Sequence, residues 1–285
     1  MSSSLLFNIA TICYCAAMVI FFVYLAGRSG IVGRAGMLAS CFGFLVQTAA
    51  IGLRWKESYD LGHGHAPLSN LYESVVFFAW TIVLIFLLID ARYRYRVIGA
   101  FVLPFALLGM AWAQLMSGPQ KAIQPLVPAL QSNWLLYHVV TCFLGYASFA
   151  VACGVSLMYL LKVRQERSKG LRPAGGMLSL FPSSRVLDEL NYRAIMIGFP
   201  LMTMGIVTGA VWANYAWGTY WSWDPKETWS LIVWLIYAAF LHARITHGWT
   251  GKRAAVLSII GFAATIFCYL GVNLLLSGLH SYGSG

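Results

Sequence analysis

The sequence predicts an all-α, polytopic membrane protein with about eight transmembrane helices and both termini on the outer side. Three observations lead to this prediction. Of the 285 residues, 60 % are hydrophobic and only 10 % are charged, whereas soluble domains carry about 25 % charged residues. The apolar residues form long runs, and a helix of roughly 20 such residues crosses the hydrocarbon core of a bilayer. The basic residues fall mainly on alternate loops, which indicates an orientation.

Eight runs are long and apolar enough to span a bilayer. They cover about residues 5–26, 35–53, 71–90, 97–116, 134–161, 194–213, 226–243 and 254–277. The first run has no basic region and no small-residue cleavage site, so we expect a retained span rather than a signal peptide. No soluble module or repeat interrupts the runs, and we expect one integral-membrane domain over residues 1–285.

The 19 Lys and Arg residues are divided unevenly between the two sets of loops. One set holds 15 of them: Arg28, Arg34, Arg92, Arg94, Arg96, Lys162, Arg164, Arg167, Lys169, Arg172, Arg185, Arg193, Arg244, Lys252 and Arg253. The other set holds 4: Arg54, Lys56, Lys121 and Lys226. The positive-inside rule makes the first set cytoplasmic, including a basic loop at about 162–193. The net charge of +10 therefore reflects topology, and we expect no nucleic-acid binding.

The segment "AWGTYWSWDPKETWSLIVW" at 216–234 lies on the outer side in this topology. With its flank it holds six of the chain's 11 tryptophans: Trp212, Trp217, Trp221, Trp223, Trp229 and Trp234. An interfacial aromatic belt explains one or two tryptophans at a helix end. The higher density here predicts a flat apolar shelf on the outer surface. Such a shelf suits a porphyrin, although a quinone or a lipid headgroup would also stack on it.

Two carboxylates in this segment have a structural interpretation. Asp224 suits the N-cap of the seventh span, Pro225 its first position and Glu227 its third. Glu227 would reach back in a capping box and fix the start of the helix. We therefore expect these carboxylates to order the loop and assign no catalytic acid or base.

A second outer segment, at about 54–70, leads into another predicted helix start. Ser69 or Asn70 suits its N-cap, and Glu73 is either part of this cap or directly functional. His63 and His65 form an H-x-H pair that could bind a metal, but no further ligand cluster accompanies them.

Three other histidines are candidate metal ligands. His138 lies about one turn inside the fifth span, and His280 follows the last span, so both lie on the outer side. Histidine is a common axial ligand of haem iron, although each residue alone could be an interfacial histidine bonded to backbone or water. His242 lies 18 residues after Asp224, about 27 Å along a helix, and therefore belongs to the other membrane face.

The pattern W-G-x-x-W-x-W-D-P-K-E-x-W at 217–229 resembles the WWD motif of haem-handling membrane proteins in cytochrome c maturation. Within that superfamily the chain is similar to the CcsA (ResC) family of the System II cytochrome c synthase. The stretch "GHAPLSNLYES" at 64–74 and the flanking histidines extend the resemblance over most of the chain.

The resemblance implies the following roles. His138 and His280 match the family's two outer ligands of haem iron, and His242 matches its inner transmembrane haem site. The haem-holding motif is matched by Trp217, Gly218, Trp221, Trp223, Asp224, Pro225, Glu227 and Trp229. In the family, the second inner ligand comes from a partner subunit, CcsB (ResB).

The implied activity is that of a cytochrome c haem lyase in complex with this partner. Haem b would move to the outer face of the inner (plasma) membrane and be presented to the CxxCH thiols of apocytochrome c. The protein's contribution would be mostly positioning. One alternative is haem delivery without attachment. A cytochrome b-type electron-transfer subunit would need two histidines about 13–14 residues apart on one helix, and a transporter of another solute would not need the clustered tryptophans.

Overall fold

In the computed structural model, residues 2–169 and 177–276 are described, and their regular structure is helical throughout. Eight helical segments are long and apolar enough to cross a membrane. They confirm the predicted fold class. The elements are α1 (Ser3–Gly27), α2 (Gly30–Asp60), α3 (Leu71–Tyr93), η1 (Arg96–Ile98), α4 (Gly99–Leu115), α5 (Gly118–Lys121), η2 (Pro128–Leu130), α6 (Asn133–Lys169), η3 (Met177–Leu180), α7 (Ser184–Trp217), α8 (Pro225–His247), α9 (Lys252–Ile266), η4 (Phe267–Gly271) and α10 (Val272–Leu275).

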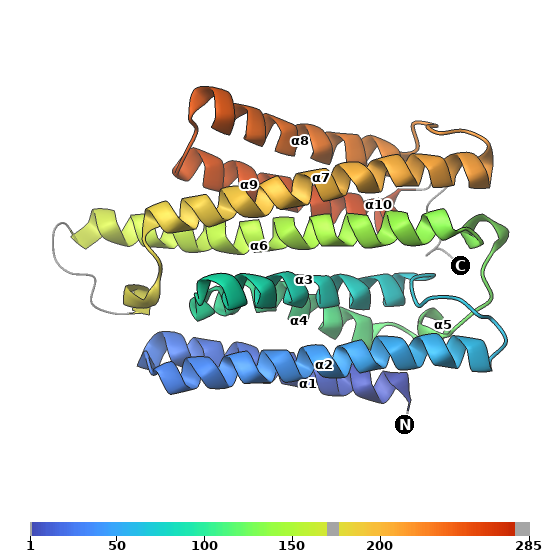
Figure 1. Ribbon diagram of the computed structural model, residues 1–285, viewed down its shortest axis with the longest axis horizontal. Coiled ribbons are helices and arrows are strands. Elements are labelled where there is room, and N and C mark those ends of the chain that lie inside the picture. The colour runs from blue at the N-terminus through green and yellow to red at the C-terminus, as the bar shows by residue number, and fades with distance from the viewer. Residues whose placement is uncertain (1, 170–176, 277–285) are drawn as a thin grey trace.

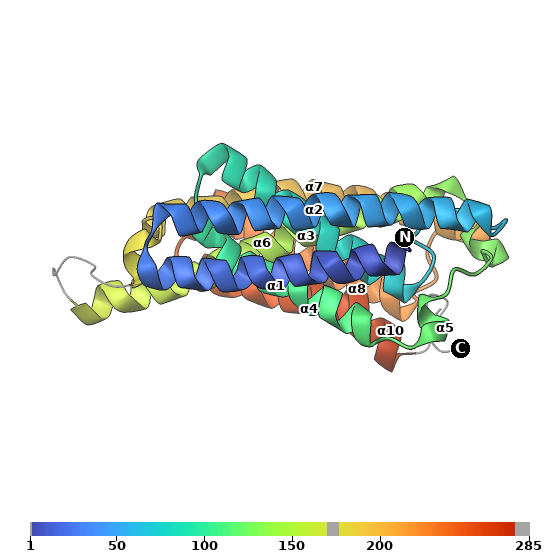
Figure 2. The ribbon, with the colours of Figure 1, turned by 90° about the horizontal axis from the view of Figure 1, so that it is seen from below.

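The long helices lie roughly parallel in an elongated bundle (Figure 1). α6 and α7 pack together near its middle, between the α3–α4 pair on one side and the α8–α9 pair on the other. α1 and α2 form a hairpin at the edge of the bundle and lie side by side along most of its length (Figure 2). The core therefore runs along the bundle, with α6 contacting α3, α4, α7 and α9.

The connections alternate between two ends of the bundle (Figure 1). One end, called the site end below, carries the start of α1, the connections 61–70, 116–132 and 218–224, and the end of α10. The other end, called the basic end, carries the connections 28–29, 94–98 and 248–251. The first and last helices thus begin and end at the same end as the tryptophan loop, as an even number of spans predicts.

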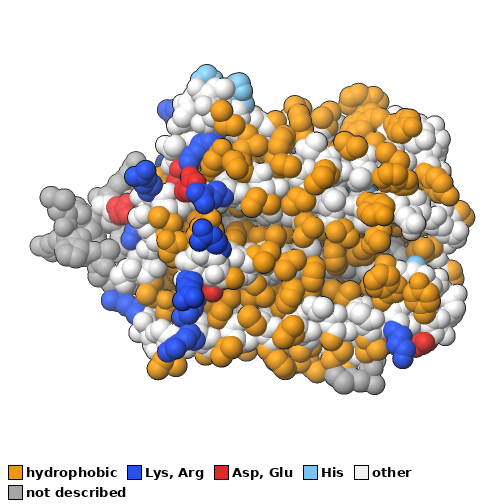
Figure 3. All heavy atoms as spheres, viewed as in Figure 1, with side chains coloured by type: hydrophobic (Ala, Val, Ile, Leu, Met, Phe, Trp, Pro, Cys, Tyr) orange, Lys and Arg blue, Asp and Glu red, His pale blue; other side chains and the backbone are white. Residues whose placement is uncertain are grey.

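Charge and hydrophobicity are separated along this axis. Lys and Arg side chains form a band at the basic end, while apolar side chains cover the middle of the visible face (Figure 3). Polar ends that flank an apolar belt are what a bilayer demands of a bundle, because hydrocarbon cannot solvate charges. The two loop sets distinguished in the sequence therefore correspond to two physical ends.

The basic loop expected at about 162–193 is shorter than predicted. α6 continues to Lys169 and α7 already begins at Ser184, where the Ser183 side chain accepts a hydrogen bond from the backbone N–H of Val186. Hydropathy marks only the apolar part of a helix, whereas the backbone hydrogen bonds continue into the polar flanks. For the same reason α2 runs beyond its predicted apolar limit to Asp60.

A buried ion pair fixes the site end. Arg54 on α2 donates from Nε to Glu73 Oε1 on α3 at 2.7 Å, and the two side chains are only 5 % and 1 % exposed. Arg54 also donates from Nη2 to the carbonyl of Lys121 at 2.8 Å. The other oxygen of Glu73 accepts from the backbone N–H and the hydroxyl of Ser69. Both oxygens of Glu73 and two of the guanidinium nitrogens of Arg54 thus have partners, as buried charges require.

Candidate functional site

The tryptophan loop, residues 218–224, is a short turn between two sharply ended helices. α7 ends at Gly218, which has φ +77° and donates its backbone N–H to the carbonyl of Asn214 at 2.9 Å. Glycine enters this left-handed region without steric cost. Trp223 also has a positive φ, +61°. A bulky residue in this region is strained, and such strain concentrates at functional loops.

The predicted capping box at the start of α8 is confirmed. The Asp224 side chain accepts from the backbone N–H of Lys226 at 2.9 Å, Pro225 opens the helix, and Glu227 reaches back to the N–H of Asp224 at 3.2 Å. Glu227 Oε2 also accepts from the N–H of Ser222 at 2.7 Å. Both carboxylates are thus engaged with the backbone of the loop, which supports their interpretation as structural groups.

The tryptophan rings do not form the flat shelf expected from the sequence. The rings of Trp221 and Trp223 are perpendicular, with an interplanar angle of 88°, and those of Trp212 and Trp217 meet at 61°. Trp229 lies inside α8 and packs on Phe267, with the ring centroids 4.3 Å apart. Edge-to-face contacts are favoured by the ring quadrupoles over coplanar arrangements. The indoles therefore form a folded aromatic wall, of which Trp223 is the exposed edge.

His138 lies in this wall at the site end of α6. Its ring stacks on Trp212, with centroids 5.8 Å apart and an angle of 21°. Its Nδ1 donates to the carbonyl of Gly205 at 2.7 Å. Because the carbonyl can only accept, this bond assigns the Nδ1 proton and leaves the lone pair of the neutral ring on Nε2. Metal-ligating histidines usually carry such a bond on their other nitrogen, so the residue fits an axial ligand of haem iron.

Two glycines of α7 make room for this histidine. A Cβ atom on Gly209 would lie 2.6 Å from His138 Nδ1, closer than real contacts allow. A Cβ atom on Gly205 would collide with the Cys142 side chain, one turn below His138. Small residues let membrane helices approach closely. Here they bring the backbone of α7 within hydrogen-bonding distance of the ring.

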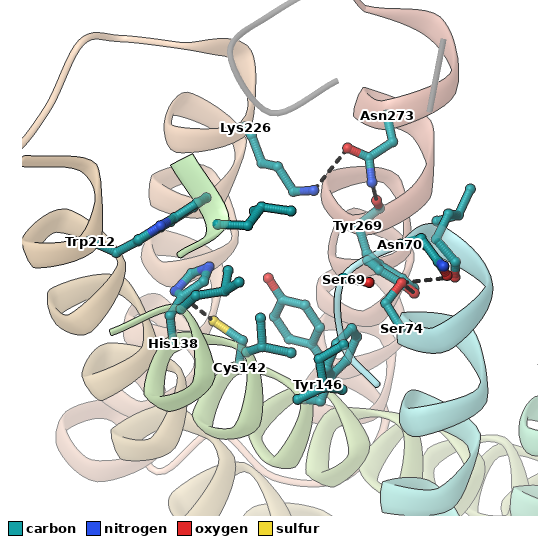
Figure 4. Close-up of a pocket in the computed structure, with 16 residues that line it drawn as sticks. Ser69, Asn70, Ser74, His138, Cys142, Tyr146, Trp212, Lys226, Tyr269 and Asn273 are labelled. Carbon is teal, nitrogen blue, oxygen red and sulfur yellow. Dashed lines mark hydrogen bonds between the residues drawn. The ribbon is translucent and has the colours of Figure 1, made fainter. Parts of the chain in front are cut away.

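The residues around His138 line an open cavity of about 150 Å³ between α3, α6, α7, α8 and the end of the last span (Figure 4). Its lining includes Trp212, Cys142, Phe143 and Tyr146. Its polar lining residues are Ser69, Asn70, Ser74, Lys226, Tyr269 and Asn273. A second, smaller cavity of about 60 Å³ shares His138 and Lys226 and reaches Trp221 and Glu227. The cavities therefore connect the histidine with the tryptophan loop.

His242, His63 and His65 do not line this cavity. His280 lies outside the described residues. His242 is exposed on α8, near the basic end. The centroids of its ring and the His247 ring are 5.7 Å apart. His65 is buried and its two ring nitrogens contact the carbonyls of Ala66 and Gln124. No group of three or more His, Cys, Asp or Glu side chains within the described ranges could hold a metal ion, so the H-x-H pair stays without further ligands.

Sequence reasoning missed several residues of the cavity. Tyr146, Tyr269 and Asn273 lie in apolar spans and carry no motif. The sequence assigns Lys226 no role beyond its place in the motif and among the four outer basic residues, although it is the sole cation within the tryptophan segment. Trp212 was counted with the tryptophans but not singled out. It is 2 % exposed, and its Nε1 donates to the carbonyl of Ala129 at 2.8 Å.

These observations define a class: a multi-pass helical membrane protein with a histidine-containing aromatic cavity at one end of the bundle. The family described as "Cytochrome C assembly protein" matches residues 68–280. The chain belongs to this family, on its CcsA branch. It is 44 % identical to the "Cytochrome c biogenesis protein CcsA" of Guillardia theta, over 88 % of this chain and 85 % of that protein. Identity to the protein of the same name from Pyropia yezoensis is 40 %, over 94 % and 93 %.

The fold also resembles a solved structure, "Cytochrome c Heme Lyase CcmF". The TM-score is 0.70 at 20 % sequence identity. The match covers 94 % of this chain but only 47 % of that one, so the chain spans about half the length of that protein. At this identity the likeness establishes the shared fold alone.

Proposed function

We propose that this chain handles haem in cytochrome c assembly and holds it at the site end for attachment to apocytochrome c. The observation that carries the proposal is His138, whose Nδ1 donates to Gly205 while its ring stacks on Trp212 in a cavity reached by the tryptophan loop. The names of the relatives, cytochrome c biogenesis proteins, agree with such a role. His280 is proposed as the second axial ligand, from the sequence alone.

The tryptophan loop would contribute shape rather than chemistry. Trp217, Trp221 and Trp223 offer ring faces and edges at different angles, which suit the faces and rim of a haem b held beside them. Gly218 and the Asp224–Pro225–Glu227 cap keep the loop in place. With Trp229 these residues form the proposed haem-holding set.

Attachment itself requires little from the protein except position. In each thioether bond, the sulfur and hydrogen of a cysteine thiol add across a haem vinyl group, so the addition is balanced without a further reactant. Holding haem and the CxxCH segment together converts a bimolecular reaction into an effectively unimolecular one. Asp224 and Glu227 bind backbone N–H groups, which leaves them as scaffolding and not as acid or base.

The proposed topology follows the positive-inside rule. The basic end would face the cytoplasm, and the site end with both termini would face the extracytoplasmic side of the inner (plasma) membrane. His242, exposed on α8 near the basic end, would be half of an inner haem site. A CcsB (ResB)-type partner would complete that site, and the lyase activity is proposed for the complex.

Haem retention tests this proposal. The complex would be purified with haem bound, and its absorption spectrum and pyridine haemochrome content would be measured. His138→Ala and His280→Ala should each lose the bis-histidine signal at the site end, and added imidazole should restore it by filling the vacated ligand position. His247→Ala, on the exposed basic end of α8, is the matched control and should keep its haem. Unchanged haem content in both ligand variants would refute the assignment.

A further inference from the structure

Lys226 is a charged side chain in the lining of the 150 Å³ cavity, and the proposed function gives it no role. It lies at the second position of α8, where the helix dipole disfavours a cation. Its side chain lines both cavities that contain His138. No carboxylate of the described residues lies within 4.0 Å of its ammonium nitrogen in an ion pair. Asp224, two residues earlier, attracts this charge, but its carboxylate caps the backbone N–H of Lys226 and forms no ion pair with the ammonium group. A lysine that faces the interior of a membrane bundle without a carboxylate in contact is a candidate for ligand binding.

The ammonium group is nevertheless held in place. Lys226 Nζ donates to Asn273 Oδ1 at 2.8 Å (Figure 4). The amide of Asn273 is itself oriented, because its Nδ2 donates to the carbonyl of Tyr269 at 2.9 Å. Tyr269 belongs to η4, a π-helical turn, and its hydroxyl contacts the Ser74 hydroxyl at 2.7 Å. π-Turns are frequent at functional sites. The chain thus holds a cation beside the cavity through a neutral hydrogen-bond partner.

The size of the cavity limits what this cation can meet. Small-molecule sites usually enclose about 300–1,000 Å³, whereas this cavity measures about 150 Å³. It therefore suits one edge of a large ligand and not the whole ligand. Haem b has one edge that carries two propionate carboxylates, and Lys226 shares the cavity with the proposed iron ligand His138.

We propose that Lys226 binds a propionate carboxylate of haem while His138 ligates the iron, so that the acidic edge enters the cavity and the vinyl edge stays accessible. The inference rests on the proposed function, since it names the part of haem that this site recognises. It assigns Lys226 as an orienting residue. A haem fixed by its propionate edge can present its vinyl groups in one direction only.

A comparison of haem with haem dimethyl ester, in which both carboxylates are neutralised, tests whether Lys226 recognises a propionate. Each would be titrated into the complex purified without haem, with the histidine-ligated Soret band as the signal. The wild-type protein should bind haem about 10- to 100-fold more tightly than the ester, the range of one charge-assisted hydrogen bond. Lys226→Met should lose this preference and Lys226→Arg should retain it. The change in this preference between the wild type and Lys226→Met measures the interaction between Lys226 and a propionate.

Asn273 supplies the matched control. Asn273→Asp would place a carboxylate beside Lys226 and neutralise it, so the preference should fall although the lysine remains. Asn273→Ala removes the hydrogen bond but leaves the cation, so the preference should persist. If the wild type binds both porphyrins through His138 with equal affinity, the role of Lys226 is overturned and the proposed function stands. If neither porphyrin shows a His138-dependent band, both are overturned.

Discussion

His138 and His242 lie toward opposite ends of the same bundle and are held in opposite ways. The ring of His138 is half-buried among helices of its own chain, oriented by Gly205 and stacked on Trp212. His242 is exposed on α8, where the centroid of its ring lies 5.7 Å from that of His247. An ionisable side chain exposed within a membrane span is unfavourable unless another surface covers it.

This difference indicates that the surroundings of His138 are formed by this chain, whereas a site at His242 would need residues from another chain. The surroundings of His138 include tight helix packing, a buried ion pair and a capped loop, all at the site end. His242 has no comparable support from this chain within the described residues. We therefore expect substitutions at the site end to change stability or haem binding without a partner, and His242 to matter only when a partner is present.

The largest effect is expected from the ion pair that braces the site end. Arg54→Ala leaves Glu73 buried without its charge partner, which should lower the free energy of unfolding by about 3–5 kcal/mol. Denaturant titration in mixed micelles would measure this. Arg193→Ala breaks the exposed pair with Glu189 on α7 and an exposed hydrogen bond to the Tyr93 hydroxyl on α3, and should cause a much smaller loss because exposed pairs contribute little. Equal losses in the two variants would show that burial does not distinguish the pairs.

The next effect concerns the approach of α7 to His138. A methyl group on Gly209 would push the ring away from the Gly205 carbonyl. Overpacking of this kind costs about 1–3 kcal/mol, so Gly209→Ala should weaken haem binding at the site end about tenfold or more. Gly52→Ala, where nothing lies within 4 Å of the added atom, is the control. If both variants bind haem like the wild type, the histidine does not need its present orientation.

A smaller effect is expected at the cap of α8. Asp224→Ala removes the acceptor for the N–H of Lys226 and should lower stability by about 1 kcal/mol. Hydrogen exchange of the backbone N–H groups at 226–228 would report the loosened first turn. Glu227→Gln keeps an acceptor for the N–H groups of Ser222 and Asp224 and should change exchange less. Greater exchange in Glu227→Gln than in Asp224→Ala would contradict this order.

The smallest effect is expected for His242. Because the side chain is exposed, His242→Ala should leave both the unfolding midpoint and haem binding at the site end unchanged in the chain alone. In complex with its partner, the same variant should lose the spectral contribution of the inner haem. If the isolated His242→Ala chain binds less haem than the wild type, His242 belongs to a haem site that this chain forms without a partner.

The fold was predictable because hydropathy and helix caps are local signals. A few consecutive residues each predict the eight spans, the capping box of Asp224 and Glu227, and a cap at Ser69 or Asn70, which the structure assigns to Asn70. The ends of α6 and α7 were less predictable, because their polar flanks stay helical without an apolar signature. The separation of His138 from His242 followed from the rise of a helix.

The site was predictable only in part, since its contacts are non-local. Tryptophan density indicated an aromatic surface but could not give the 88° angle between Trp221 and Trp223, which depends on the backbone of the loop. The link from Lys226 to Asn273 joins residues 47 positions apart. The choice between a capping and a functional role for Glu73 needed its partner Arg54, 19 positions away, whose contact identifies a structural brace.

The same pair has a consequence for biosynthesis. Arg54 is made before Glu73, and α2 reaches the membrane with an uncompensated charge near its end until α3 follows. Until Glu73 follows, Arg54 lacks the carboxylate that neutralises it in the buried pair at the site end. We therefore expect α2 and α3 to pack as one unit, and a nascent chain arrested between them should hold α2 less firmly than one arrested after α3.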